Sequence, residues 1–237
     1  MGREAYNLKA AAEHVNVDAN ELKHAAQRGE IEGASEHGGD WWFEHRGLDE
    51  WAQRSLLAAT KRELLARYDA MMSGLKREKR DSWRLTGLFR EDAIDLAASA
   101  KTRGGMIRDM TDLAIASGLV YDDEGLYKEL VAREEAAPTA VGKGAAFLHP
   151  RYHDPYFFED TFVAYARAKR PVFFGAPDGE PTRHFFLICS TDHEQHLRIL
   201  SRLAVLAHGT DLIERLDAAE NSTQVIDAVK HCEDEIA

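Results

Sequence analysis

The stretch that decides the fold runs from Leu130 to Tyr156 and reads LVAREEAAPTAVGKGAAFLHPRYHDPY. Its first part has the composition of a helix, and a short apolar segment follows the closely spaced glycines Gly142 and Gly144. His149 comes directly after that apolar segment and is followed by a proline. A helix, a glycine-containing turn and a short strand that leads into a histidine indicate mixed α and β structure here.

His149 is a candidate phosphate acceptor because of its chemistry. A neutral imidazole nitrogen is a competent nucleophile toward phosphorus, and the site around it needs donors for the phosphoryl oxygens and a nearby positive charge. The backbone at Gly142 and Gly144 could supply N–H donors, since glycine permits close approach of the main chain. A single histidine can equally be an ordinary core or surface residue. The residues around His149 therefore have to show whether it is a phosphate acceptor.

Outward from this stretch, the periodicity predicts further strands and helices. Strands are expected near Ala93–Leu96, Phe162–Ala166 and His184–Cys189, the last two joined through a turn at Pro177–Gly179. Helices are expected over Thr102–Ser117, Glu124–Glu134, His193–His208, Asp211–Ala219 and Thr223–Asp234.

Four motifs in this region carry a family resemblance. They are L-x-x-R-E at Leu130–Glu134, G-x-G-x-A-x-x-H at Gly142–His149, P-V-x-F-x-A-x-D-G-x-P at Pro171–Pro181 and H-L-x-x-L-S-x-L-A at His196–Ala204. With them, the segment Leu85–Glu235 resembles the enzyme IIA domains of fructose–mannitol type sugar phosphotransferase systems, including their nitrogen-regulatory relatives. The resemblance implies a mixed β-sheet flanked by helices.

The resemblance also implies roles for three side chains. His149 matches the phosphorylated histidine, whose phosphoryl donor is the phosphorylated carrier protein HPr or an equivalent. His196 matches a second histidine that hydrogen-bonds the phosphoryl group, although its place on a helix also suits a satisfied core histidine. Arg133 matches the arginine that offsets the phosphoryl charge. Leu148 departs from the family's usual proline, which leaves open whether phosphate still reaches the site.

No cofactor and no metal site are expected. His153, Asp154, Glu159 and Asp160 follow His149 closely, but they meet no recognised ligand spacing. The cysteines, Cys189 and Cys232, form no CxxC pair and suggest reduced residues.

Residues 1–55 have the outline of a winged helix-turn-helix. Asn7–Glu13 looks helical, Asp18 is a plausible N-cap with Gly29 ending the second helix, and Gly38-Gly39 indicates a hairpin. The segment resembles excisionase and MerR-like DNA-binding families. That resemblance implies DNA contacts from the second helix, which presents Asn20, Lys23, His24, Gln27 and Arg28.

Charge argues against DNA binding by this segment. Residues 1–50 hold five Lys or Arg against eleven Asp or Glu, and the wing Glu36–Glu44 has neither Lys nor Arg. Duplex DNA binding depends largely on neutralising phosphates. The alternative is a helix-turn-helix shape used for protein contacts. Trp41, Trp42 and Trp51 could line a ligand site, but aromatic residues at the junction of a wing and a helix more often form a small core.

Residues 56–84 are expected to form a basic helical connector. The apolar stripe in Glu50–Trp83 lies close to heptad spacing and suits either packing within the chain or a homodimer. Its members are Leu56, Leu57, Leu64, Leu65, Tyr68, Met71, Met72 and Leu75. The cluster Lys76–Arg80 is a solvated end or a phosphate contact.

Length and composition bound the remaining choices. The chain has 237 residues, 44% of them hydrophobic and 30% charged, so it suits a folded protein of about two domains. With no apolar run long enough to span a bilayer and no signal core, a cytoplasmic protein without membrane contact is expected. The expected domains are 1–55, 56–84 and 85–237. The function implied is a phosphotransferase-linked, DNA-binding transcriptional regulator whose enzyme IIA-like domain accepts a phosphoryl group on His149. The alternative is a phosphocarrier or regulatory enzyme IIA-like protein that acts through protein contacts without DNA binding.

Overall fold

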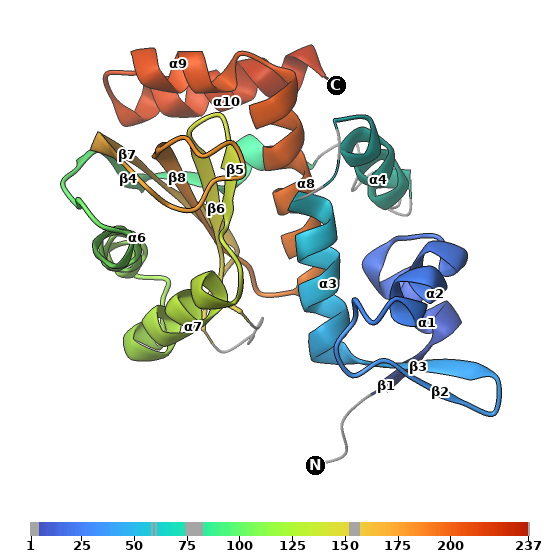
Figure 1. Ribbon diagram of the computed structural model, residues 1–237. Coiled ribbons are helices and arrows are strands. Elements are labelled where there is room, and N and C mark those ends of the chain that lie inside the picture. Colours follow the sequence, from blue (N-terminus) through green and yellow to red (C-terminus); the bar gives the residue numbers. More distant parts are fainter. Residues whose placement is uncertain (1–4, 58, 60, 74–82, 152–156, 237) are drawn as a thin grey trace. The chain divides into compact units, whose positions relative to one another are not determined.

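The structure is a computed structural model that describes residues 5–57, 59, 61–73, 83–151 and 157–236, with only the backbone of Lys61. It divides into two compact units, Met1–Lys76 and Arg77–Ala237. Each unit is considered by itself below (Figure 1). Among the described residues, no helix combines the length and the apolar character needed to cross a membrane.

The first unit combines short helices with a small antiparallel sheet of strand order β1-β3-β2. Its elements are β1 (Ala5–Asn7), α1 (Leu8–Val15), α2 (Ala19–Gln27), β2 (Ser35–His37), β3 (Asp40–Glu44), α3 (His45–Leu57) and α4 (Lys61–Ser73). The helices, the tight turn and the hairpin expected from the sequence are therefore present. Their identity as a winged helix-turn-helix stays a prediction.

Local rules explain the ends of these elements. Asp18 caps α2 by accepting hydrogen bonds from the backbone N–H groups of Asn20 and Glu21, as expected. The carboxylate of Glu21 pairs with Arg67 of α4 at 2.6 Å, which ties α4 to α2. Gly38 and Gly39 both have positive φ and make the two-residue hairpin turn between β2 and β3.

The segment Glu50–Trp83, expected to be helical, holds two helices in the part that the structure describes, because α3 ends at Leu57 and α4 begins at Lys61. Leu56, Leu64, Tyr68, Met71 and Met72 are buried in the single chain, so the apolar stripe supports packing within it. Lys76–Arg80 and Leu75 lie outside the described residues. Phe43 and Trp51 are buried, whereas Trp42 is 40% exposed and does not belong to the core.

The second unit is a five-stranded mixed sheet of order β4-β7-β8-β6-β5 with helices on both faces (Figure 1). Its strands are β4 (Phe89–Ala98), β5 (Ala140–Gly142), β6 (Ala145–Leu148), β7 (Phe162–Val172) and β8 (Thr182–Cys189). Its helices are η1 (Leu85–Leu88), α6 (Arg103–Ala116), α7 (Asp123–Ala136), α8 (His193–Gly209), α9 (Leu212–Ala218) and α10 (Ser222–Glu235). The expected helices are confirmed within one or two residues, and β4 and β7 are each longer than expected.

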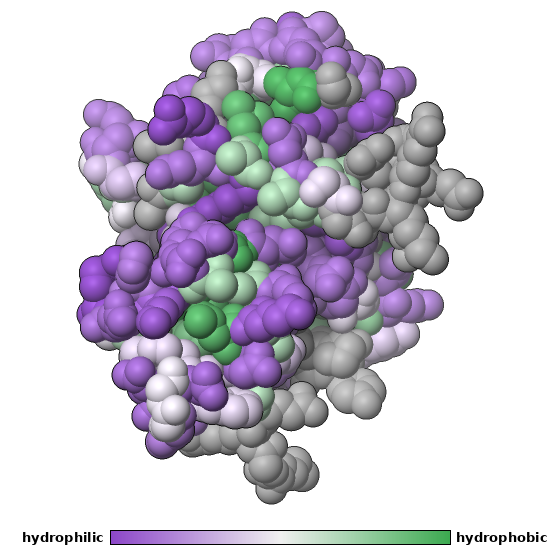
Figure 2. Space-filling view, turned by 90° about the vertical axis from the view of Figure 1, so that its right-hand side faces the viewer, coloured by the Kyte–Doolittle hydropathy of each residue, from purple (hydrophilic) through white to green (hydrophobic). Residues whose placement is uncertain are grey.

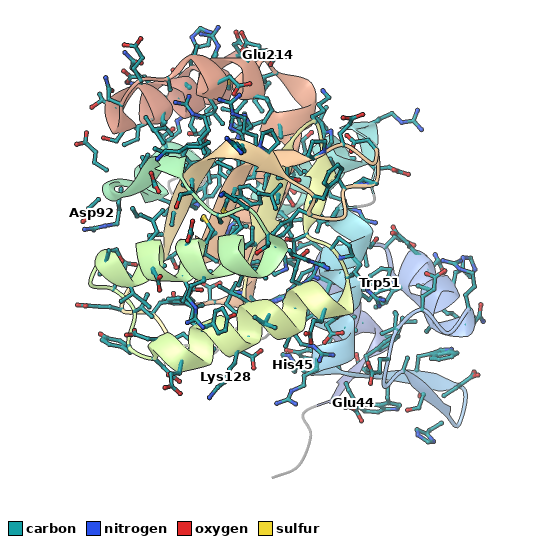
Figure 3. All side chains as sticks on the ribbon, turned by 60° about the vertical axis from the view of Figure 1, so that its left-hand side comes forward. Glu44, His45, Trp51, Asp92, Lys128 and Glu214 are labelled. Atoms are coloured by element: carbon teal, nitrogen blue, oxygen red, sulfur yellow. The ribbon has the colours of Figure 1, made fainter. Side chains whose placement is uncertain are left out.

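Alternation along the strands supplies a core on each face of the sheet. Ala146 and Leu148 of β6 join the core that α6 and α7 cover, while Phe147 packs on Phe186 of β8 on the other face, 5.6 Å between ring centroids. The outer faces of the helical layers are polar, and Lys128 of α7 and Glu214 of α9 point outward (Figure 3).

The first and last segments of this unit are joined by a buried carboxylate. Glu233 of α10 accepts hydrogen bonds from the backbone N–H groups of Leu85 and Thr86, each 2.9 Å, and pairs with buried Arg202 of α8 at 3.5 Å. The start of η1 is therefore fixed to α10, the last helix of the unit.

Hydrophilic residues predominate on the face of the molecule that Figure 2 shows, with small hydrophobic areas between them. Among the described residues, the exposed large hydrophobic side chains are Trp42, Tyr121 and Phe173. Isolated residues of this kind are ordinary on a protein surface.

Candidate functional site

The candidate site lies where β6 and β8 end. These two strands are parallel, with Leu148 opposite Leu187, so their carboxyl ends meet at one edge of the sheet. His149 follows β6 directly, and α8 begins four residues after β8. The topology thereby brings His149 and His196, in the first turn of α8, within 4.8 Å between ring centroids.

The ring of His149 makes two hydrogen bonds that define its protonation state. Nδ1 lies 2.9 Å from the backbone oxygen of Phe147, and Nε2 lies 3.0 Å from Nε of Arg133. A carbonyl oxygen can only accept and a guanidinium can only donate, so Nδ1 carries the proton and Nε2 offers its lone pair. Nε2 is therefore the nucleophilic atom of the ring.

Arg133 is held in place from its own helix. It lies near the C-terminus of α7, is 3% exposed, and donates from Nη1 to the backbone oxygen of Ala137 at 2.7 Å. The structure thus brings together the three side chains that the sequence analysis grouped, which are His149, His196 and Arg133. It also places a guanidinium against Nε2, the ring nitrogen that carries the lone pair.

Glu134, the neighbour of Arg133, connects three segments around the site. Its carboxylate accepts from Oγ1 and N–H of Thr139, at 2.6 and 3.1 Å, and from Nη2 of Arg103 on α6 at 2.7 Å. Burial raises the pKa of Glu134, and the bonds from Thr139 and Arg103 oppose that rise.

A backbone relay continues from Thr139 to the histidine. Its carbonyl accepts from N–H of Phe147 at 3.0 Å, and the carbonyl of Phe147 in turn accepts from His149. Sequence reasoning missed Arg103, Thr139 and the Phe147 carbonyl as supports of the site. The only local signal was the glutamate in the L-x-x-R-E motif.

The N-terminus of α8 is fixed by its own cluster of polar groups. Asp192 caps the helix by accepting from N–H of Gln195 at 2.8 Å. Thr161, at the start of β7, donates to the side chain of Gln195 at 3.0 Å and accepts from N–H of Thr191 at 3.1 Å. His196, in this turn, is fully buried, and Ile199, Leu200 and Leu203 face inward as expected.

The structure does not bring Gly142 and Gly144 to His149, so it lends no support to their expected role in the phosphate pocket. They form the turn between β5 and β6, at the opposite end of β6 from His149, roughly 13 Å away for a four-residue strand. Their positive φ values explain the glycines as turn residues. Asp178, from the Pro-Asp-Gly turn, accepts from N–H of Lys143 at 2.9 Å and clamps this turn.

Leu148 has a structural role in the place where the resemblance implied proline. It is the last residue of β6, pairs with Leu187, and is 2% exposed in the core beneath α6 and α7. Register with β8 thus fixes the exit of the strand, a task that a proline ring would otherwise perform.

The other predicted site residues lie in the first unit. Asn20, His24, Gln27 and Arg28 are exposed on α2 or at its end, and Lys23 is partly exposed. Arg28 makes two hydrogen bonds to Glu30, of 2.5 and 3.0 Å, so its charge is offset within the chain. His153 and Asp154, considered for a metal site, lie outside the described residues.

A separate hollow of about 810 Å³ lies in the first unit, far along the chain from the histidine pair. Its lining includes Lys9, Asp18, Lys23, Trp41 and Trp42. The His149 site and this hollow therefore lie in different units.

Comparison with known proteins assigns the second unit. The family model described as "Phosphoenolpyruvate-dependent sugar phosphotransferase system, EIIA 2" matches residues 87–232. The chain belongs to this EIIA type 2 family. The EIIA domain is thus the part of the chain that carries His149, His196 and Arg133.

Curated relatives agree with the EIIA assignment. A fructose-specific EIIA component of Haloferax volcanii is 31% identical over 140 residues, covering 58% of this chain and 89% of the relative. A nitrogen regulatory protein of Bradyrhizobium diazoefficiens is 28% identical over 144 residues, covering 60% and 91%. A fructose-specific EIIABC component of Bacillus subtilis is 26% identical over 148 residues, but the match spans only 23% of its length.

Solved structures share the fold of the EIIA domain. The nitrogen regulatory protein IIA-Ntr of Neisseria meningitidis superposes with a TM-score of 0.55 at 22% identity, covering 61% of this chain and 98% of that one. The IIA mannitol structure of Escherichia coli gives a TM-score of 0.52 at 22% identity, covering 58% and 96%. The expected mixed sheet flanked by helices is confirmed.

Proposed function

We propose that this protein is a regulatory protein linked to a phosphotransferase system, and that its EIIA domain accepts a phosphoryl group on Nε2 of His149. The observation that carries the proposal is the pair of hydrogen bonds on the ring, from Nδ1 to the carbonyl of Phe147 and from Arg133 to Nε2. Together they present a neutral nucleophile beside a fixed positive charge.

The transfer step follows from this geometry. The lone pair on Nε2 attacks the phosphorus of a donor phosphohistidine, the N–P bond of the donor breaks, and its electron pair returns to the donor imidazole. Nδ1 of His149 keeps its proton, bonded to Phe147. The N–H of Arg133 that now faces Nε2 then meets a phosphoryl oxygen.

His196 would add a second contact to the phosphoryl group. Its ring lies 4.8 Å from that of His149, which is close enough for an N–H donor to reach a phosphoryl oxygen. It also lies in the first turn of α8, where the helix dipole favours a negative charge.

The donor is expected to be a protein that carries phosphohistidine, such as phosphorylated HPr. The family description, a phosphoenolpyruvate-dependent phosphotransferase system, supports this expectation. Two relatives named nitrogen regulatory proteins support the regulatory role. His149 is fully buried, so docking of the donor has to displace the side chains that cover Nε2.

A finer hypothesis concerns DNA binding by the first unit. The exposed residues of α2 and the neighbouring hairpin form a shape that suits DNA binding. The charge does not suit it, because Arg28 is paired with Glu30 and the hairpin has no Lys or Arg. We therefore place protein contacts ahead of DNA contacts for this unit. A homodimer through residues 56–84 stays a prediction.

Transfer of label from phosphorylated HPr to the full chain tests the proposed function. Wild type and His231→Gln, which alters an exposed histidine of α10, are expected to take up equal label. His149→Gln is expected to take up none. Equal label on His149→Gln would assign the phosphate elsewhere, and no label on wild type would leave the EIIA domain a module for protein contacts.

A further inference from the structure

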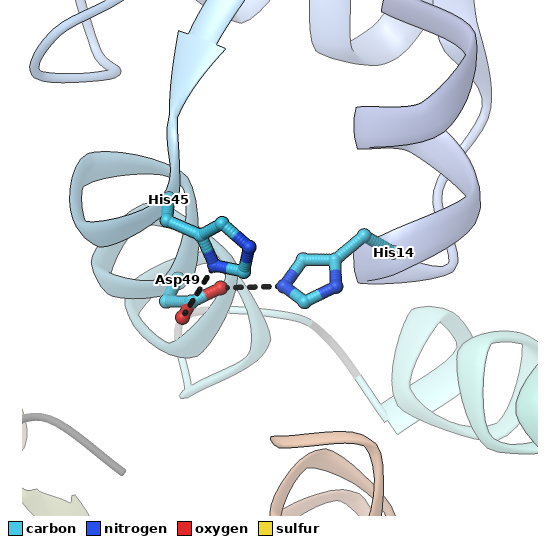
Figure 4. Close-up of side chains that lie close together, drawn as sticks. All are labelled: His14, His45 and Asp49. Carbon is cyan, nitrogen blue, oxygen red and sulfur yellow. Dashed lines mark hydrogen bonds and ion pairs between the residues drawn. The ribbon is translucent and has the colours of Figure 1, made fainter. Parts of the chain in front are cut away.

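Two histidines and one aspartate converge in the first unit (Figure 4), and none of them belongs to the EIIA domain. His14 lies in the last turn of α1, and His45 and Asp49 lie four residues apart on α3. Residues at this spacing share one face of a helix. One ligand atom from each of the three side chains lies within 4.8 Å of the others.

The contacts within this cluster point the ligand atoms toward a common centre. Nε2 of His14 lies 2.8 Å from Oδ1 of Asp49, and Nδ1 of His45 lies 3.9 Å from Oδ2 of the same carboxylate. The two imidazole rings are 5.0 Å apart and approach edge to face. The side chains are 15%, 35% and 20% exposed for His14, His45 and Asp49, so water and small ions reach them.

Tyr6 on β1 supports the orientation of both histidines. Its ring packs on those of His14 and His45, at 4.8 and 4.3 Å between centroids. Its hydroxyl lies 3.5 Å from Nδ1 of His14. In the structure Nε2–H of His14 donates to the carboxylate of Asp49, which can only accept. When an ion takes the place of that proton, Nδ1 can carry a proton that donates to the Tyr6 hydroxyl, and Nε2 offers its lone pair to the ion, as outer partners of metal-bound histidines commonly arrange.

We propose that His14, His45 and Asp49 form a binding site for a divalent transition-metal ion of the Zn²⁺ type. Two imidazole nitrogens and one carboxylate oxygen suit such an ion, and three protein ligands leave one position for water. Bonds of about 2.0–2.2 Å require small side-chain rotations from the present separations. The ion would then replace the direct hydrogen bond between His14 and Asp49.

The site would join α1 to α3. His14 comes from one helix and the other two ligands from the start of another, so a bound ion adds a link between segments 31 residues apart in sequence. Binding to the folded state alone stabilises that state.

A second cluster in the chain is less suited to a metal ion. Asp211, Cys232 and Glu235 also bring ligand atoms together, but burial raises the pKa of the Cys232 thiol and disfavours the thiolate. Asp211 is already paired with Arg215 at 2.7 Å. This second cluster is the other place in the described chain where an ion could bind, so it needs its own variant.

Calorimetric titration of the full chain, without a histidine tag, with Zn²⁺ tests the proposal, and Co²⁺ absorption reports the ligand geometry. We expect one equivalent to bind to wild type and to raise its Tm. His45→Gln is the informative variant, because it leaves the His14–Asp49 pair intact, and it is expected to weaken binding at least about tenfold. His37→Gln, an exposed histidine of the same unit, is the matched control and should bind like wild type.

Two results would overturn the proposal. One is the absence of stoichiometric Zn²⁺ binding by folded wild type. The other is unchanged binding by His45→Gln, and loss of binding in Cys232→Ser would then assign the ion to the second cluster. Circular dichroism of each variant confirms folding. Because these ligands lie outside the EIIA domain, the outcome is independent of phosphate transfer to His149.

Discussion

The two nitrogens of the His149 ring have different partners, and each partner permits one protonation state. The carbonyl of Phe147 requires a proton on Nδ1, and the guanidinium of Arg133 requires a lone pair on Nε2. At the scale of single residues, these contacts leave the lone pair on Nε2, which is the nitrogen that the proposed transfer needs.

Phosphate is therefore expected on Nε2 alone. Nuclear magnetic resonance of the phosphorylated chain, through couplings between phosphorus and the ring nuclei, distinguishes the two nitrogens. A phosphoryl group on Nδ1 would show that the hydrogen bond to Phe147 breaks before transfer, contrary to the mechanism above.

Arg133 should contribute to the rate of transfer. Arg133→Gln removes the charge beside Nε2 and is expected to slow phosphorylation by about 10²–10³-fold, the usual effect of losing one fixed donor. Arg133→Lys keeps the charge without the planar fork and should fall between. Arg170→Gln, at an exposed position of β7, is the control and should match wild type in single-turnover assays. An unchanged rate in Arg133→Gln would limit this arginine to a structural role.

At the scale of elements, Glu134 joins α7 to α6 and to the segment that leads into β5. Its buried carboxyl has a raised pKa. A raised pKa in the folded state means that its contribution to stability is present below the ordinary value of 4.5 and is lost as pH rises through the raised value.

Glu134→Gln should remove this dependence. As pH rises from about 4.5, the free energy of unfolding of wild type is expected to fall relative to that of the variant. Denaturant unfolding at a series of pH values measures the difference. Glu135→Gln alters the exposed neighbour, so the difference between its free energy of unfolding and that of wild type should not change with pH. If the free energy of unfolding of wild type instead rose relative to that of Glu134→Gln as pH increased, the upward direction of the pKa shift would be wrong.

Elements set by local rules could be predicted from the sequence, and contacts between distant elements could not. Asp18, Gly29 and Gly38-Gly39 mark their helix and hairpin ends through capping and positive φ. The residues 142 and 144, by contrast, seemed close to His149 because they are near in sequence, whereas the intervening strand carries them to the opposite end.

The site was predictable only through the motifs. Nothing in periodicity indicates that β6 and β8 run parallel, and that pairing is what brings α8 to His149. The cluster of His14, His45 and Asp49 was missed for the same reason, since the antiparallel β1–β3 pairing brings its segments together.

At the scale of the whole molecule, one buried carboxylate closes the second unit. Glu233→Ala leaves Arg202 buried without this partner and frees the N–H groups of Leu85 and Thr86. We expect a loss of about 3–5 kcal/mol in the free energy of unfolding, as for other buried pairs. Glu235→Ala removes only an exposed pair with His231 and should cost below about 1 kcal/mol. If both variants lost the same free energy of unfolding in denaturant, Glu233 would not hold the first and last segments of the unit together.

The distribution of charge bears on DNA binding. The first 50 residues are acidic, and the chain has a net charge of −11. Any complex with duplex DNA in an electrophoretic shift assay is therefore expected to be weak and to disappear between about 50 and 200 mM salt. A sequence-specific complex that survives this range would instead favour the finer hypothesis.

The complete burial of His149 affects how long a phosphoryl group would stay on it. A phosphoramidate exposed to solvent is lost to attack by water, whereas one enclosed by protein is shielded until a partner opens its surroundings. The phosphorylated chain should therefore have a long half-life on its own and a short one beside an acceptor. It would act as a memory of the last encounter with its donor.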